Sequence, residues 1–307
     1  HLHFRFGEYE RDLDIRWGSK DVGSAFIGMS KADSITIDPH KMGYVNYPCG
    51  MVAFKNDRVR HFIIQKAPYI TSIRQDILVH MPPKHLEKLD DSPRVVVEAF
   101  APFIVEGSRP GAAATALWLT TKTIPPTMKE SGSIIRASLL SARELYEWLI
   151  HWEKISERNK SDKDYQYLPL TINPPDTNVV IFSIKKKTSN SLSKMNRLTE
   201  LVYEHFTIQT ELGEREYSYA QPFFLSKTTF EEPIYPFNSL RKFFEMYFSK
   251  TYTEKLHETY KTEGLKVLRA SVMNPYIAIT NDLQEHSILR DFMGELSDAA
   301  NESVKLI

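Results

Sequence analysis

The chain has 307 residues, 42% of them hydrophobic and 25% charged, which is typical of a soluble globular protein. Lys and Arg (39) balance Asp and Glu (39), so the net charge indicates neither a nucleic-acid partner nor a membrane partner. No apolar run reaches the roughly 18 residues that a membrane-spanning helix needs. The single cysteine, Cys49, excludes a disulfide within the chain, so we expect a small buried residue and a reducing, cytoplasmic location.

Two short β-rich runs flank a link that is rich in reactive side chains. Residues 34–38 form the first run, which stops at Pro39, and residues 51–54 form the second. Residues 66–98 contain several Pro and Asp breakers, and we expect a long loop there. The reactive residues of the link between the two runs are His40, Lys41, Tyr44 and Tyr47.

The rest of the chain alternates between helical and extended patterns, which favours an α/β or α+β fold. No internal repeat interrupts this alternation. The predicted helices cover 112–120, a long segment capped by Ser131 or Ser133, 198–205, 240–247 and 288–296, and the predicted strands cover 179–182, 223–226 and 266–273.

The most informative segment is Asp33–Tyr44, which reads Asp-Ser-Ile-Thr-Ile-Asp-Pro-His-Lys-Met-Gly-Tyr. It places Lys41 in a turn directly after a strand, where its amine can project beside the end of a sheet and where Asp38 can supply a hydrogen bond. A lysine that acts as a nucleophile needs a lowered pKa or a carbonyl partner. From the residues alone, a solvated surface lysine is the simpler interpretation.

The amino-acid sequence of this segment closely resembles the cofactor-lysine segment of group II pyridoxal-phosphate (PLP) decarboxylases. Within that group it is most similar to bacterial tyrosine decarboxylases and to archaeal tyrosine or aspartate decarboxylases. Three later stretches, 106–112, 174–178 and 267–276, resemble the same family in the same order. The resemblance implies an α/β fold of the fold-type-I PLP-dependent transferase class: residues 1–130 would be the carboxyl-terminal part of the large PLP-binding domain, and residues 131–307 the small carboxyl-terminal α/β domain.

The same resemblance implies a mechanism. Lys41 would carry PLP as a Schiff base while an L-amino acid loses its carboxylate as CO2. Tyr47, six residues after the lysine, would protonate the α-carbon. The resemblance also implies that His40 contacts the cofactor phosphate. Ser108 and Arg109 would contact the same phosphate from the partner subunit of a homodimer. Ser271 would contact the substrate.

Each of these roles has a simpler structural alternative. Tyr47 could be a packed aromatic residue, and His40 could brace the turn without contacting the phosphate. Ser108 and Arg109 could only shape the turn before a helix, and Ser271 could be a buried strand residue bonded to the backbone.

One family feature does not match. Family members carry a His-x-Asp-Ala-Ala segment whose Asp pairs with the pyridine nitrogen, and an ungapped match places His3 at the position of that Asp. The family's phosphate-binding loop would precede His1. We therefore expect this chain to be part of a larger or split protein, with a separate N-terminal half as one arrangement.

The leading functional prediction is PLP-dependent decarboxylation of an L-amino acid, with a tyrosine-like aromatic substrate first and glutamate or aspartate second. The alternative is a catalytically inactive PLP-fold homologue or fragment that acts as an interaction or regulatory subunit. A third hypothesis is a lyase of phosphorylated amines, because Gly-Ser-Arg-Pro-Gly also occurs in sphingosine-phosphate lyases, but the Met-Gly-Tyr after Lys41 speaks against it. No metal site is predicted.

Overall fold

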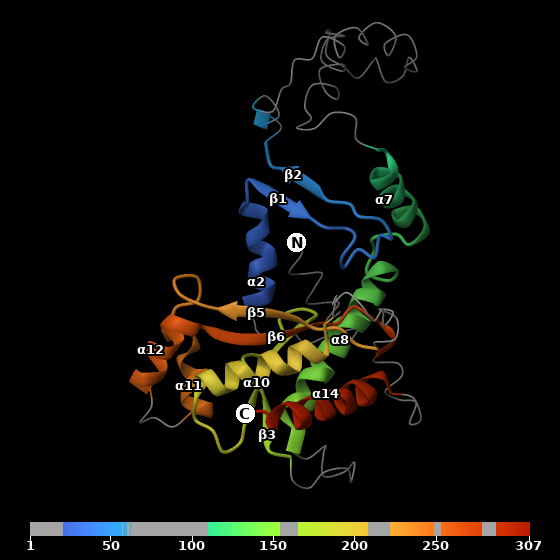
Figure 1. Cartoon of the computed structure of the whole chain (residues 1–307). Helices are drawn as coiled ribbons and strands as arrows, with labels where there is room; N and C mark the ends of the chain where they lie inside the picture. Colours follow the sequence, from blue (N-terminus) through green and yellow to red (C-terminus); the bar gives the residue numbers. More distant parts are fainter. Residues whose placement is uncertain are drawn as a thin grey trace, which may run out of the picture. The chain divides into compact units, whose positions relative to one another are not determined.

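The computed structural model describes residues 21–56, 58–59, 62, 110–153, 165–207, 222–248, 253–277 and 287–307 (Figure 1). Contacts within the chain divide it into two compact units. One unit is Gly28–Pro125, and the other is Pro126–Ile307 together with the residues before Gly28. The predicted boundary between residues 130 and 131 stays a prediction.

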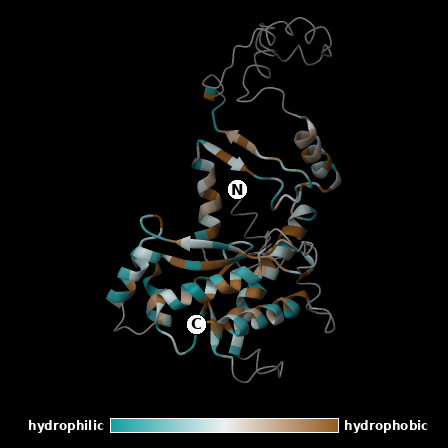
Figure 2. Ribbon diagram, in the orientation of Figure 1, coloured by the Kyte–Doolittle hydropathy of each residue, from teal (hydrophilic) through white to brown (hydrophobic). Residues whose placement is uncertain are grey.

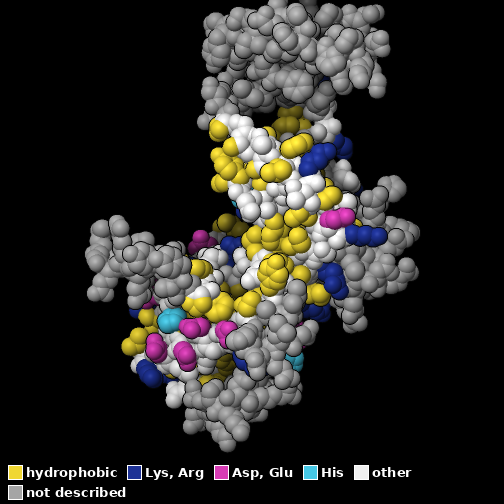
Figure 3. Space-filling view, turned by 90° about the vertical axis from the view of Figure 1, so that its right-hand side faces the viewer, with side chains coloured by type: hydrophobic (Ala, Val, Ile, Leu, Met, Phe, Trp, Pro, Cys, Tyr) yellow, Lys and Arg dark blue, Asp and Glu magenta, His cyan; other side chains and the backbone are white. Residues whose placement is uncertain are grey.

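The unit Gly28–Pro125 contains a β-hairpin and a helix. Strand β1 (Ser34–Ile37) pairs antiparallel with β2 (Met51–Phe54), with Ile37 opposite Met51, so both predicted strands are confirmed. Helix α7 (Ala112–Thr123) extends three residues beyond its predicted end. Most hairpin side chains are exposed, and hydrophobic side chains are visible on the surface of this unit (Figure 3). The predicted loop over 66–98 lies outside the described residues. A short 3-10 helix, η1 (Met29–Lys31), precedes β1.

The unit Pro126–Ile307 is built on a four-stranded antiparallel sheet with the order β3-β4-β6-β5. The predicted strands at 179–182 and 266–273 are confirmed, whereas the strand predicted at 223–226 is wrong except for its last residue. Leu225 lies instead in the segment just before β5, and its side chain is buried in the hydrophobic core. The strands are β3 (Tyr167–Thr171), β4 (Val179–Lys186), β5 (Ser226–Phe230) and β6 (Leu265–Ser271).

Three helices bury one face of this sheet. They are α8 (Ser131–Ile150), α10 (Leu192–His205) and α14 (Ile288–Val304), and they share a core with Phe182 and Leu268, which face each other across β4 and β6. Apolar and polar residues alternate around α10 and α14, as expected for helices that are buried on one side (Figure 2).

The N-cap residue of α8 differs from the one predicted. Neither Ser131 nor Ser133 caps α8: the N-cap residue is Glu130, and the Ser133 hydroxyl donates to the Glu130 carbonyl at 2.7 Å. The side chains of Ser191 and Ser287 do cap α10 and α14, because each accepts a hydrogen bond from a backbone N–H three residues later.

A second core lies where η4 (Phe237–Leu240), α11 (Arg241–Tyr247) and α12 (Thr253–Glu263) meet the sheet. Its centre is aromatic, with the rings of Phe237 and Phe244 stacked at 5.0 Å. The predicted helix over 240–247 is confirmed. Helices α12 and α2 (Asp21–Gly28) and strand β3 were not expected from the sequence.

Candidate functional site

The candidate site is the link between β1 and β2. Ile37 and Met51 are paired residues of the hairpin, so the thirteen positions between them leave the sheet at one end and return to the same end. All three reactive residues predicted to act here, His40, Lys41 and Tyr47, therefore lie in one loop.

Backbone hydrogen bonds fold the start of this loop into a compact turn. The N–H of Lys41 donates to the Asp38 carbonyl (3.0 Å), and the N–H of Tyr44 donates to the Lys41 carbonyl (3.0 Å). The N–H of Val45 returns to the Pro39 carbonyl (3.1 Å), and the Pro39 and Val45 side chains are buried. These bonds fix the backbone on both sides of the lysine.

Two conformational constraints follow from this turn. A Cβ atom at Gly43 would lie 2.5 Å from the Pro39 carbonyl oxygen, a distance that Cβ atoms do not tolerate, so glycine is required there. Tyr44 adopts a left-handed conformation with φ of 54°, which is uncommon for a residue with a side chain. Neither constraint was predicted from the sequence, although a glycine so soon after a reactive lysine is a signal that could have indicated a tight turn.

Lys41 is accessible and is held by one carboxylate. Its Nζ lies 2.8 Å from Oδ2 of Asp38, and its side chain is 66% exposed. The hydrogen bond from Lys41 lowers the pKa of Asp38, and the attraction of the Lys41 charge adds to that effect. The prediction that Asp38 hydrogen-bonds to the lysine is confirmed. The amine therefore projects from a rigid turn and remains open to a reagent.

The His40 ring is held by the backbone of Cys49, near the end of the loop that leads into β2. Its Nδ1 contacts the carbonyl oxygen of Cys49, and the Cys49 N–H lies 3.3 Å from the same nitrogen. These contacts tie the ring to the residue two positions before β2, so His40 braces the loop. Cys49 itself is a buried free cysteine, as predicted. A role of His40 at a phosphate stays a prediction.

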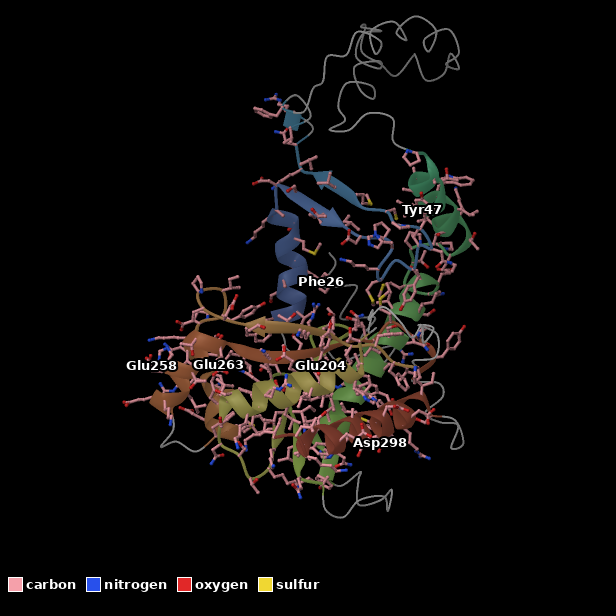
Figure 4. The ribbon with its side chains drawn as sticks, in the orientation of Figure 1. Phe26, Tyr47, Glu204, Glu258, Glu263 and Asp298 are labelled. Atoms are coloured by element: carbon pink, nitrogen blue, oxygen red, sulfur yellow. The ribbon has the colours of Figure 1, made fainter. Side chains whose placement is uncertain are left out.

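The remaining predicted site residues are distributed over the chain. Tyr47, labelled in Figure 4, is 40% exposed in the same loop. Ser271 is the exposed last residue of β6, opposite Val179, in the unit Pro126–Ile307. Its predicted alternative as a buried residue is therefore wrong. Ser108 and Arg109 lie outside the described residues, and the roles of all four stay predictions.

Metal-binding and membrane-spanning features are both absent from the described residues. Within the described ranges, no group of three or more His, Cys, Asp or Glu residues could hold a metal ion. Among the helices in the described part of the chain, none is long and apolar enough to cross a membrane.

The fold is of the fold-type-I class. The structure matches the crystal structure of mouse CSAD in its apo form, with a TM-score of 0.52 over 93% of this chain and 43% of that one. The two sequences are 13% identical, so this likeness concerns the fold alone. The architecture is the carboxyl-terminal portion of fold type I, as predicted.

The chain belongs to the tyrosine decarboxylase family. The family described as "Tyrosine decarboxylase, C-terminal" matches residues 141–300. The L-tyrosine decarboxylase of Enterococcus faecium is 31% identical over 258 residues, which cover 84% of this chain, and that of Enterococcus faecalis is 29% identical over 270 residues, or 88% of this chain. The chain spans 36% and 37% of the length of these two relatives.

Proposed function

We propose that this chain is the lysine-bearing carboxyl-terminal part of a PLP-dependent L-amino-acid decarboxylase. The observation that carries the proposal is the Lys41 turn, in which an exposed amine projects from a backbone fixed on both sides, within a chain of the tyrosine decarboxylase family. The names of the relatives support an aromatic, tyrosine-like substrate ahead of glutamate or aspartate.

The residues of the loop fit the cofactor. An aldehyde condenses with an unhindered primary amine, and Lys41 is the accessible amine at the centre of the turn. PLP, when bound, supplies an electron sink for the electrons left behind by the departing carboxylate. His40, held through its ring by the Cys49 backbone, would support the cofactor phosphate. Ser108 and Arg109 would approach the same phosphate from a partner subunit.

Two further side chains would act on the substrate. Tyr47 is exposed enough to reach a ligand, and its hydroxyl would deliver a proton to the α-carbon after CO2 leaves. Ser271 would border the substrate. Asp38 would hold the Lys41 amine in place whenever that amine is not bound to the cofactor, because the two groups lie in direct contact.

The proposal includes an assembly and a location. The active protein would be a cytoplasmic homodimer, and the residues that complete the cofactor pocket would come from a further part of the protein or from a separate N-terminal half. The matched region covers 36% and 37% of the length of the two relatives, which supports this need for further residues. Residues 1–130 would complete the large domain, and residues 131–307 would form the small one.

Trapping the cofactor tests the proposal directly. The protein, purified with every chain that accompanies it, is incubated with PLP and reduced with borohydride, and its peptides are analysed by mass spectrometry. We expect the pyridoxyl mass on the Lys41 peptide, its loss in Lys41→Ala, and its retention in Lys55→Ala, a matched exposed lysine just after β2.

The substrate is then identified by CO2 release from tyrosine, glutamate and aspartate. Label on Lys41 together with CO2 release from tyrosine is the expected result. Label without CO2 release from any of the three would support the inactive homologue, the alternative that the unmatched position of His3 favours. A lack of label on Lys41 at saturating PLP would overturn the proposal.

A further inference from the structure

Among the lysines that the structure describes, Lys185 is the buried one. It lies near the end of β4, it is 6% exposed, and it pairs with Leu168 of β3. A lysine is almost never buried in this way unless a partner compensates its charge. No role proposed above uses Lys185, so its chemistry is separate from that of the loop that carries Lys41.

The amine of Lys185 ends among apolar and aromatic side chains. Side chains alternate along a strand, so Lys185 and Ile181 share the face of the sheet opposite to Phe182. Ile181 packs against the second core, around η4, α11 and α12, whereas Phe182 belongs to the core shared with α8, α10 and α14. The Nζ atom lies 5.6 Å from the centroid of the Phe248 ring, and Phe248 is a buried member of the second core.

No counter-charge accompanies this amine within the described residues. Lys185 takes part in none of the ion pairs found there, whereas Lys187, two residues later, lies 3.2 Å from the carboxylate of Glu153. An ammonium group in apolar surroundings loses hydration that the face of a ring replaces only in part. Burial accordingly lowers the pKa of Lys185. A larger share of this amine is therefore neutral, and the neutral amine is the form that attacks a carbonyl carbon.

The same surroundings select the reagent. A carbonyl compound that carries a carboxylate or a phosphate would lose the hydration of that group beside Phe248 without gaining a counter-charge from the described residues. A small uncharged aldehyde loses little hydration there. The imine that it forms is neutral, so the product also needs no counter-charge. Burial thus favours both the reactive form of the amine and the uncharged product.

We propose that Lys185 is a nucleophilic lysine that condenses with small uncharged aldehydes. The lone pair of Nζ attacks the carbonyl carbon, the carbon–oxygen bond breaks, and the oxygen leaves as water with the two hydrogens of the amine, so a neutral imine remains. The proposal is independent of the proposed catalytic function, because neither Lys41 nor PLP takes part.

Reductive methylation tests the proposal. The full chain and its companions, without PLP, are treated with formaldehyde and cyanoborohydride at a pH of about 6, where a lysine of ordinary pKa is neutral in roughly one molecule in 10⁴. Cyanoborohydride delivers hydride to the imine and leaves a methylamine on the lysine. Fragment mass spectrometry then measures the methylation of each lysine separately.

The adjacent and less buried Lys186 is the internal reference. We expect methylation of Lys185 to exceed that of Lys186 at least roughly threefold in the folded protein. Accessibility alone predicts the reverse order, because Lys185 is the more buried of the two. In urea, where the surroundings of both amines are lost, the ratio is expected to return to about one. Lys41→Ala is expected to keep the wild-type ratio.

A pair of variants isolates the missing counter-charge. Leu168 is half-buried opposite Lys185, and Leu168→Glu places a carboxylate beside the amine. A carboxylate there holds the amine in its charged form, so the Lys185 to Lys186 ratio is expected to fall severalfold. Leu168→Gln, which has the same size without the charge, is expected to keep a ratio above one. Circular dichroism checks that both variants are folded.

The choice of aldehyde tests the selection against charge. With acetaldehyde, which is uncharged, the ratio of Lys185 to Lys186 is expected to exceed the ratio with glyoxylate, an aldehyde that carries a carboxylate, at least roughly threefold. Comparing ratios removes the difference in intrinsic reactivity between the two aldehydes.

Three results would each overturn the proposal. They are methylation of Lys185 at or below that of Lys186 in the folded wild-type protein, a ratio that urea leaves unchanged, and equal ratios with acetaldehyde and glyoxylate. All three are measured on the wild-type protein, so the test does not depend on whether Leu168→Glu folds. In folded Leu168→Glu, an unchanged ratio would likewise contradict the proposal.

Discussion

The ammonium group of Lys41 lies 2.8 Å from the carboxylate of Asp38, three residues earlier in the same turn. The pair lies where the hairpin strand β1 ends, and the backbone of both residues is joined by the Lys41 N–H to Asp38 carbonyl bond. The exposed amine of Lys41 is thus held by a partner that the turn itself supplies.

The first prediction concerns this pair. Lys41→Met should raise the pKa of Asp38 toward its ordinary value, because the hydrogen bond from Lys41 is the largest cause of the depression. Since the folded-state pKa is the lower one, the contribution of Asp38 to stability is present above the unfolded pKa and is lost as pH falls through the folded pKa. NMR titration of the Asp38 carboxyl carbon measures the shift, and Lys31→Met, a change in η1, should leave it unchanged.

The second prediction concerns the glycine of the turn. Gly43→Ala should destabilise the unit Gly28–Pro125 by about 1–3 kcal/mol, because the new methyl group would overlap the Pro39 carbonyl that accepts the Val45 N–H. Gly28→Ala is the matched control, since a Cβ there meets no atom within 4 Å. Hydrogen exchange of the Val45 amide reports the effect locally. Equal protection in the two variants would contradict the prediction.

The third prediction concerns Glu200 on α10, which joins the helix to two strands. Its carboxylate accepts hydrogen bonds from Lys266 at 2.8 Å and from Lys227 at 3.0 Å, and these two bonds lower its pKa, that from Lys266 most. Glu200→Gln should cost about 1 kcal/mol or less, because the group is partly exposed and screened by water. The loss should be present at neutral pH and vanish as pH falls through the folded-state pKa of Glu200.

Urea denaturation at several pH values measures this dependence. The control is Glu204→Gln. Glu204, labelled in Figure 4, forms an ion pair with Arg197 that is longer, at 3.8 Å, and more exposed. A larger effect in Glu204→Gln than in Glu200→Gln would contradict the assignment.

The fourth prediction concerns Lys185, a buried lysine on β4. It is 6% exposed, and the one contact of its Nζ that the structure gives within the described residues is with the Phe248 ring, 5.6 Å from the centroid. Burial lowers its pKa. At pH values between the lower pKa of Lys185 in the folded state and its higher pKa in the unfolded state, the unfolded chain binds more protons than the folded one. The free energy of unfolding therefore rises with pH through that window.

Lys185→Met should therefore stabilise the unit Pro126–Ile307 by about 1 kcal/mol at neutral pH and remove this rise. Thermal unfolding measured across alkaline pH follows both effects. The neighbouring and less buried Lys186 gives the control, and Lys186→Met should change stability little.

The sequence predicted well those elements that carry a strong local pattern. In these elements the apolar periodicity and the flanking breaker residues indicate the same type of structure. They are the two hairpin strands, the helices α7, α8, α10 and α14, and the central strands β4 and β6. Strand β3 was missed because Pro169 lies within it, which is tolerated since β3 is an edge strand. Helix α12 was missed because it is mostly charged and polar, and Leu256 and Tyr260 are the buried residues among those described in it.

The site was predicted in part for a similar reason. Lys41, His40 and Tyr47 are close in sequence, so a local motif was sufficient to place them in one loop. The need for glycine at position 43 and the left-handed conformation of Tyr44 depend on how the loop returns to Pro39, which a linear pattern does not encode. A cavity of about 300 Å³ beside Phe292 is lined by residues from four distant segments, which a linear pattern does not bring together.

The strand order has a consequence for synthesis and folding. Strand β6 is the last of the four strands along the chain, yet it lies between β4 and β5 and pairs with both. Until residues 265–271 leave the ribosome, β5 lacks its neighbour in this sheet and β4 has only β3. The unit therefore cannot complete its sheet progressively from the amino end, and we expect its cooperative folding to begin only once β6 is available, with a rate limited by these long-range pairings.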